Sequence, residues 1–162
     1  MKLDKFTQKS QEAIFAAQEL GQDYSHQVIE PIHLLLALIQ QDDGIIPALV
    51  TRVAGSAQAL RAELENELSR RPKVSGSNMD VGLSQAASDV LKAAERYAKG
   101  MQDDYVSTEH ILLGLTDSPE SKRRASYGLT KDAILVALKS VRGSQRVTTP
   151  DPESTYQSLE KY

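Results

Sequence analysis

Residues 29–38 read Ile-Glu-Pro-Ile-His-Leu-Leu-Leu-Ala-Leu, and residues 105–115 read Tyr-Val-Ser-Thr-Glu-His-Ile-Leu-Leu-Gly-Leu. The two stretches are copies of one motif. A shift of 77 positions lays residues 6–38 on residues 83–115 without a gap, so that His33 meets His110. Periods of this kind indicate a duplicated structural unit. Each copy is too small to bury much apolar surface alone, so we expect the copies to pack on each other.

Apolar residues in both copies recur every three or four positions, which predicts amphipathic helices. The first helix of each copy carries such a stripe, formed by Phe6, Ala13, Ile14, Ala17 and Leu20 in one copy and by Leu83, Ala87, Val90, Leu91, Ala94, Tyr97 and Ala98 in the other. Thr7 and Ser84 are suitable N-caps because a hydroxyl accepts from the first helical turn. Gly21 is suited to end the first helix in a left-handed turn.

The leucine-rich stretches predict the most buried helices, because they are apolar nearly all round. One begins at Pro31, which suits the first helical position, and its copy begins at Thr108 after a Ser107 cap. Further helices are expected at 46–53, ending at Gly55, at 57–68, and at 131–141. Residues 120–127 are unusually polar, which predicts a short or loosely packed helix. The fold class is all-α, with about eight helices in two pseudo-repeats of four, and no strand is expected.

The expected domain covers residues 1–145, with repeats at about 6–70 and 83–143. Residues 71–82 are rich in Gly, Pro and Ser and predict a loop between the repeats. Residues 146–162 lose the helical periodicity and are interpreted as a partly stiff linker toward an absent ATPase module, with a further helix starting at about residue 155.

Composition excludes several classes of function. Among 162 residues, 40% are hydrophobic and 25% charged, which is typical of a folded domain. The net charge is -3 without a long basic run, so no nucleic-acid partner is expected. The chain has no cysteine, which excludes disulfides and thiolate sites. It has neither an apolar signal core nor the roughly 20 apolar residues of a membrane span, so a cytoplasmic location without membrane contact is expected.

Motifs for catalysis, phosphate binding and metal binding are missing from the sequence, so no enzyme activity, cofactor or metal is expected. His33 and His110 hold equivalent positions in the first turn of their helices and are interpreted as structural rather than as a metal pair. His26 lies in a polar stretch and is expected to be solvated. The paired carboxylates Asp42-Asp43 and Asp103-Asp104 are also expected to be solvated loop charges, because nothing indicates a cleft around them.

The two leucine-rich copies together resemble the N-terminal domain of the Clp unfoldase family, whose fold is two four-helix pseudo-repeats. Three flanking stretches resemble the protein disaggregases within that family, namely 3–7, 71–76 and 141–162. The resemblance therefore covers the whole chain. It implies a stress-response chaperone whose parent is a homo-hexameric AAA+ ring. ATP and magnesium would bind in the absent AAA+ modules, and the parent would work with the DnaK chaperone system.

In that family the N-terminal domain weakly binds unfolded or aggregated polypeptides, which fits an apolar groove with a polar rim. The isolated domain is expected to be a monomer. A second hypothesis is an adaptor-docking domain of a Clp protease unfoldase, which would prefer one folded partner. A third, a small stand-alone enzyme, lacks support from any motif.

We predict the groove between the first helices of the two repeats. Phe15 lies off the core stripe, at the position of Lys92 in the second repeat, and either contacts client or packs beneath a loop. Ile14 and Leu91 are either groove floor or core. The family resemblance adds three polar residues, which are Thr7, Asp103 and Glu109. Their alternative roles are capping for Thr7 and solvated charge for the two acids, with Glu109 also favouring its helix N-terminus.

Overall fold

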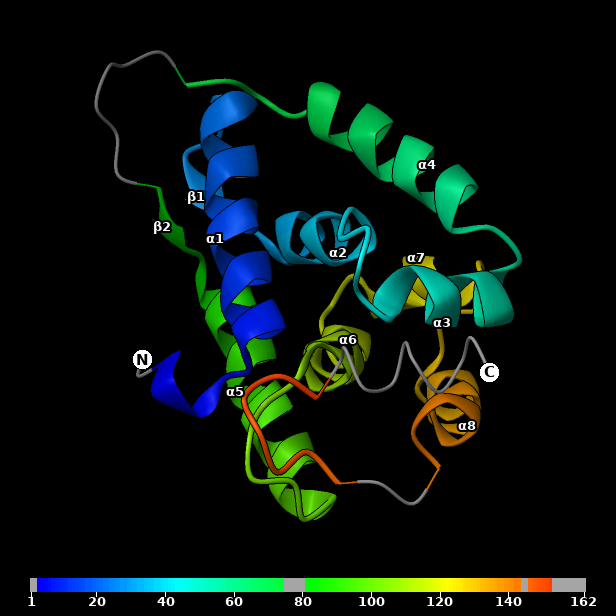
Figure 1. Cartoon of the computed structure of the whole chain (residues 1–162). Helices are drawn as coiled ribbons and strands as arrows, with labels where there is room; N and C mark the ends of the chain where they lie inside the picture. The colour runs from blue at the N-terminus through cyan, green and yellow to red at the C-terminus, as the bar shows by residue number, and fades with distance from the viewer. Residues whose placement is uncertain (1–2, 75–80, 144–145, 153–162) are drawn as a thin grey trace.

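The computed structural model describes residues 3–74, 81–143 and 146–152. After a short 3-10 turn (Leu3–Lys5), the first repeat contains α1 (Gln8–Asp23), α2 (Pro31–Ile39), α3 (Ile46–Ala54) and α4 (Ala57–Ser69). The second contains α5 (Gln85–Gly100), α6 (Thr108–Thr116), α7 (Ser121–Ala125) and α8 (Lys131–Arg142). Shifting the bounds of α1 and α2 by 77 positions reproduces those of α5 and α6, which confirms the all-α fold and the duplication (Figure 1).

The predicted N-caps are present. Thr7 accepts from the backbone N–H of Ser10 at 3.2 Å, and Ser84 accepts from that of Ala87 at 3.0 Å. Thr130 caps α8 in the same way. Each hydroxyl satisfies an N–H that has no partner inside the helix, which fixes where the helix begins.

Gly21 does not end α1, contrary to the sequence prediction. The helix continues to Asp23, and Gly21 is buried inside it. A Cβ at Gly21 would lie 3.1 Å from Cγ1 of Val81, so the glycine allows the segment before α5 to approach α1. The left-handed turn comes later, at Ser25 (φ 57°), and recurs at the equivalent Gln102 (φ 61°).

A small amount of β-structure, which the sequence did not predict, joins the repeats. β1 (Val28–Ile29) and β2 (Gly82–Leu83) form a parallel pair with Val28 opposite Gly82. Phe6 and Val106 form a further parallel bridge. β1 precedes α2 and β2 precedes α5, while Val106 and Phe6 precede the equivalent helices α6 and α1. Packing the repeats together aligns the free backbone groups of these segments, which must find partners once buried. Two residues are too few for a periodicity to show in the sequence.

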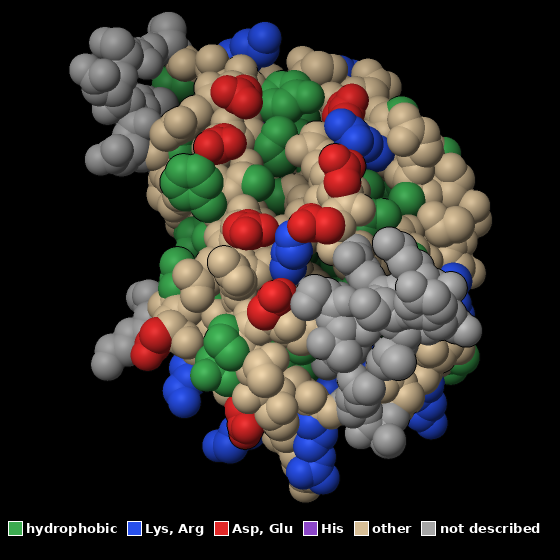
Figure 2. All heavy atoms as spheres, in the orientation of Figure 1, with side chains coloured by type: hydrophobic (Ala, Val, Ile, Leu, Met, Phe, Trp, Pro, Cys, Tyr) green, Lys and Arg blue, Asp and Glu red, His purple; other side chains and the backbone are tan. Residues whose placement is uncertain are grey.

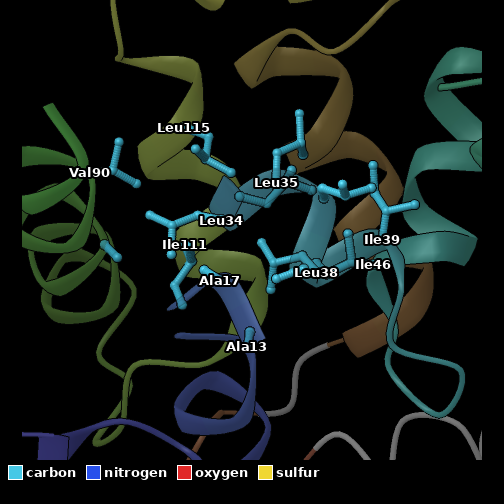
Figure 3. Packing of buried hydrophobic residues seen from close by; sticks show 14 of the residues in the cluster. Ala13, Ala17, Leu34, Leu35, Leu38, Ile39, Ile46, Val90, Ile111 and Leu115 are labelled. Atoms are coloured by element: carbon cyan, nitrogen blue, oxygen red, sulfur yellow. The ribbon is translucent and has the colours of Figure 1, made fainter. Parts of the chain in front are cut away.

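The core lies between the repeats, and α2 and α6 form its centre, as predicted. Every residue of α2 is buried. Figure 3 shows Leu34 and Leu38 of α2 pointing toward Ile111 of α6 and the alanines of α1. Helix α1 packs mainly on α2, and α5 on α6. The second pair is closer, because Gly114 of α6 brings its Cα against the backbone of Val90.

The third helix of the second repeat is short, as its polarity predicted. Helix α7 has five residues, against nine in α3. Its Arg124 is buried and pairs with Glu67 of α4 at 3.5 Å and with Glu120 at 3.4 Å. An ion pair therefore replaces part of the apolar packing that α3 supplies in the first repeat.

Residues 146–152, predicted as linker, lie along the domain. The N–H of Asp104 donates to Val147 O at 2.7 Å, and that of Gln8 donates to Pro150 O at 2.8 Å. The expected helix from residue 155 lies outside the described residues. No helix in the described part of the chain is long and apolar enough to cross a membrane.

Candidate functional site

Thr7 lies where the two repeats meet. Its side chain is fully buried and caps α1, and its N–H donates to Val106 O at 2.9 Å. The structure thus gives Thr7 the capping role that the sequence offered as an alternative. Direct contact with a client stays a prediction.

Asp103 is buried rather than solvated, so the sequence interpretation as a loop charge was wrong. Both oxygens of its carboxylate bond to Arg142, at 2.7 and 3.0 Å. His110 Nε2 lies 2.7 Å from Oδ2, and the N–H of Val147 donates to Oδ1 at 2.8 Å. The bidentate arginine explains how a full charge is tolerated in the interior.

The hydrogen bonds around Asp103 also fix its charge. Burial alone would raise the pKa of this carboxyl, but the bonds from His110, Arg142 and Val147 outweigh burial and hold the pKa well below its usual 3.8. The Ser107 N–H donates to His110 Nδ1 at 2.9 Å, so the ring proton lies on Nε2 and points at the carboxylate. Asp103 is therefore ionised throughout the neutral range.

Glu109 belongs to the same cluster. It lies in the first turn of α6, is fully buried, and accepts from the hydroxyl of Ser107. Its Oε2 is 3.7 Å from Nη1 of Arg142. The solvated role offered by the sequence is wrong, whereas the favourable position at a helix N-terminus is present. Asp103 and Glu109 thus share one cation, Arg142.

The first repeat fills the equivalent place with two histidines. His26, expected to be solvated, is buried, and its Nδ1 lies 2.8 Å from His33 Nε2. The Glu30 N–H donates to His33 Nδ1 at 2.8 Å, so His33 donates through Nε2, and His26 donates in turn to Leu68 O at 3.2 Å. The structural role predicted for His33 and His110 is confirmed.

Burial lowers the pKa of both histidines in this pair. The pKa of His33 falls from 6.5 to about 4, because of burial first and then the nearby charges of His26 and Arg71. The pKa of His26 is lowered chiefly by burial as well. Both rings are therefore neutral at pH 7, and among the described residues no cluster of three metal-ligating side chains is found.

The apolar site residues separate into two groups. Ile14 and Leu91 are equivalent positions on α1 and α5 and are both buried in the core. Phe15 is 61% exposed, which favours the surface role over packing beneath a loop. Client contact by any of the three stays a prediction.

An open groove of about 630 Å³ lies at the C-terminal end of α5, beside α8. Its apolar lining consists of Met101, which directly follows α5, and of Leu135, Val136 and Leu138 of α8. Val136 is 70% exposed, more than any other large hydrophobic residue in the described part of the chain. The rim is polar, with Asp132, Lys139 and Arg146.

This groove differs in place from the one predicted between α1 and α5. Its wall includes Arg142, the partner of Asp103 and Glu109, so two of the predicted polar residues lie directly behind it. Sequence reasoning missed Val136, although the signal was present. Val136 lies off the stripe of Ile134, Leu138 and Val141, as Phe15 lies off the stripe of α1.

The fold and the groove define a class of protein: a duplicated helical domain that presents an apolar surface groove. Comparison with known families agrees, since the Clp repeat (R) N-terminal domain model matches residues 5–130. The chain therefore belongs to the Clp repeat N-terminal domain family. Domains of this family are non-catalytic binding domains of AAA+ ATPases and do not themselves bind the nucleotide.

The curated relatives refine this assignment. The chaperone protein ClpB of Bacillus anthracis is 38% identical over 167 residues, which cover all of this chain and 19% of the relative. The chain therefore spans about a fifth of the length of the curated relatives it matches. The predicted resemblance to this branch of the family, whose curated relatives are named chaperone protein ClpB, is confirmed.

Solved structures share the fold. The Hsp104 N-terminal domain from Candida albicans superimposes with a TM-score of 0.81, at 24% identity, covering 93% of this chain and all of that one. A ClpV N-domain solved in complex with a VipB peptide gives a TM-score of 0.60 at 17% identity, covering 98% of this chain and 89% of that one.

Proposed function

We propose that this chain is the substrate-binding N-domain of a ClpB-type disaggregase, which weakly captures unfolded or aggregated polypeptides for a ring motor. The observation that carries the proposal is the exposed apolar groove at Val136, in a chain that matches ClpB relatives over its whole length. Non-native chains expose apolar side chains without a fixed sequence. An open apolar groove accommodates many such segments and is specific for none.

The proposal includes the parent protein. A homo-hexamer would carry six copies of this domain, and several weak sites acting together raise the overall affinity. ATP and magnesium would bind in the AAA+ modules of the parent, which would act in the cytoplasm with the DnaK system. The isolated domain would be a monomer.

The predicted site residues take different roles in this proposal. Val136 and Phe15 would contact clients directly, since their side chains are exposed. Asp103 and Glu109 would act through Arg142, whose position shapes one wall of the groove. Thr7, Ile14 and Leu91 would support the junction and the core beneath.

A binding titration tests the proposal. Labelled casein, an unfolded protein, is titrated with the domain and compared with a folded protein of similar size. We expect weak saturable binding to casein, none to the folded protein, and several-fold weaker binding by Val136→Asp. Gln58→Asp adds the same charge at an exposed position on α4 and serves as the control. Equal binding of folded and unfolded proteins, or of none, would contradict the proposal.

The second candidate is docking of one defined partner. The relevant observation is the related fold of a ClpV N-domain that was solved with a VipB peptide. The same titration distinguishes the two functions. One partner bound tightly, with casein ignored, would favour docking, whereas similar weak affinities for unrelated unfolded proteins favour client capture.

A further inference from the structure

We propose that the groove between α5 and α8 prefers client segments that combine apolar with acidic residues. The inference rests on the proposed function and adds a substrate class to it. The apolar half of the preference follows from the lining, because Met101, Leu135 and Val136 gain most when an apolar segment removes them from water.

The acidic half follows from the charges on the rim. Lys139 and Arg146 are both exposed and line the groove, and neither makes an ion pair with another residue of the described ranges. Among the described residues, Asp132 is the single carboxylate of the rim. Arg142 lies in the wall, but its side chain is 5% exposed and its guanidinium is engaged by Asp103. Two accessible cations therefore face an incoming segment.

The positive charge of this rim is opposite in sign to the net charge of the molecule. The whole chain carries a net charge of -3. In Figure 2, acidic side chains gather on the upper part of the face, over α1 and α4, while Lys and Arg side chains gather at the lower edge, near the end of α5 and α8. Attraction to the net charge would favour a basic client, so a preference for acidic segments would have to come from a local site.

The aliphatic stem of Lys139 widens the apolar surface as well. Lys139 follows Val136 by three positions and thus shares its face of α8, where its methylenes border the apolar floor while its ammonium stays in water. A segment with a carboxylate beside an apolar anchor can therefore use both ends of this side chain. Each exposed ion pair is individually weak, so the preference is expected to be moderate and sensitive to salt.

The test uses three peptides with one apolar core and flanks of Glu, Gln or Lys, measured by fluorescence anisotropy against the whole chain. We expect the Glu peptide to bind about fivefold more tightly than the Gln peptide, and the Lys peptide to bind most weakly. The Glu preference should disappear in 0.5 M salt. In the double variant Lys139→Glu/Arg146→Glu the order should reverse.

A matched control changes net charge equally elsewhere, with Arg70→Glu and Lys92→Glu, which are both exposed. The Glu preference should survive in this control. If all three peptides bind equally while casein still binds, the inference is overturned and the proposed function stands. If neither peptides nor casein bind, both fail. Sedimentation that shows a dimer, lost in Lys139→Glu/Arg146→Glu, would make the groove an interface between copies and also overturn the inference.

Discussion

The two repeats place different chemistry at the same position. His26 of the first repeat and Asp103 of the second are separated by the repeat offset, and each bonds to Nε2 of the equivalent helix histidine, His33 or His110. In the first repeat the partners are two neutral rings and a carbonyl. In the second, the carboxylate of Asp103 accepts hydrogen bonds from Arg142 of α8 and from the N–H of Val147.

This difference gives the equivalent positions of the two repeats different structural roles. The neutral pair in the first repeat connects α2 to the end of α4 without any charge, because His26 donates to the carbonyl oxygen of Leu68. The charged cluster in the second repeat ties α6, α8 and the segment after α8 together, directly behind the groove. The second repeat therefore links its core to a binding surface and to the chain that leaves the domain.

The largest expected effect comes from Arg142→Met. The variant leaves Asp103 and Glu109 buried without their cation, which costs about 4 kcal/mol in the free energy of unfolding. Arg61→Met, which removes a half-exposed pair with Glu65, should cost less than about 1 kcal/mol. Urea denaturation of both variants measures the difference. Similar losses would show that the charged cluster contributes little.

Acid should weaken the first repeat before the second. The folded pKa of His33 lies below its unfolded value, so the unfolded chain binds more protons between pH 6.5 and about 4, and stability falls with pH across that window. The loss is about 3 kcal/mol in total. The lowered pKa of Asp103 keeps its contribution intact until below pH 3.8.

NMR titration of the imidazoles, with urea denaturation at pH 7 and pH 4.5, measures this effect. A His33 ring that titrates near 6.5, or equal stability at the two pH values, would contradict the prediction that His26 and His33 form a buried neutral pair.

Helix packing offers a third contrast. Ala37 of α2 occupies the position of Gly114 in α6, where a Cβ would lie 2.5 Å from Val90 O. Gly114→Ala should therefore cost about 2 kcal/mol, although alanine favours helices. Gly100→Ala, at the end of α5 with open space around it, should be neutral or slightly stabilising. Thermal unfolding that shows Gly114→Ala to be as stable as Gly100→Ala would mean that the close approach is not needed.

The smallest change in stability is expected for Phe15→Lys, which makes α1 resemble α5 at Lys92. Phe15 is mostly exposed, so stability should change by less than about 0.5 kcal/mol. Casein binding should weaken about twofold if Phe15 contacts client. Unchanged binding would confine the client site to the groove beside α8.

The sequence predicted the local features well. The offset of 77, the hydroxyl caps and the leucine-rich helices depend on neighbours within a turn or on a repeated pattern, both of which can be read along the chain. The short α7 was also predicted, because its polarity is a local property.

The site was harder to predict because its contacts are distant in sequence. Asp103 and Arg142 are 39 residues apart, and His26 and Leu68 are 42 apart, so polar residues in loops were taken for solvated ones. One signal was available. The repeat offset of 77 pairs His26 with Asp103. When polar residues occupy equivalent positions in both repeats, each near an equivalent histidine, the position is expected to be buried in both.

The most direct test of the central claim is a backbone NMR titration of the labelled domain with unfolded casein. We expect the shifts to concentrate on the groove, at Met101, Leu135, Val136 and Lys139, and to extend through Arg142 to Asp103. Shifts confined to surfaces away from α5 and α8, or the absence of any shift at saturating casein, would contradict the claim that this groove captures non-native chains.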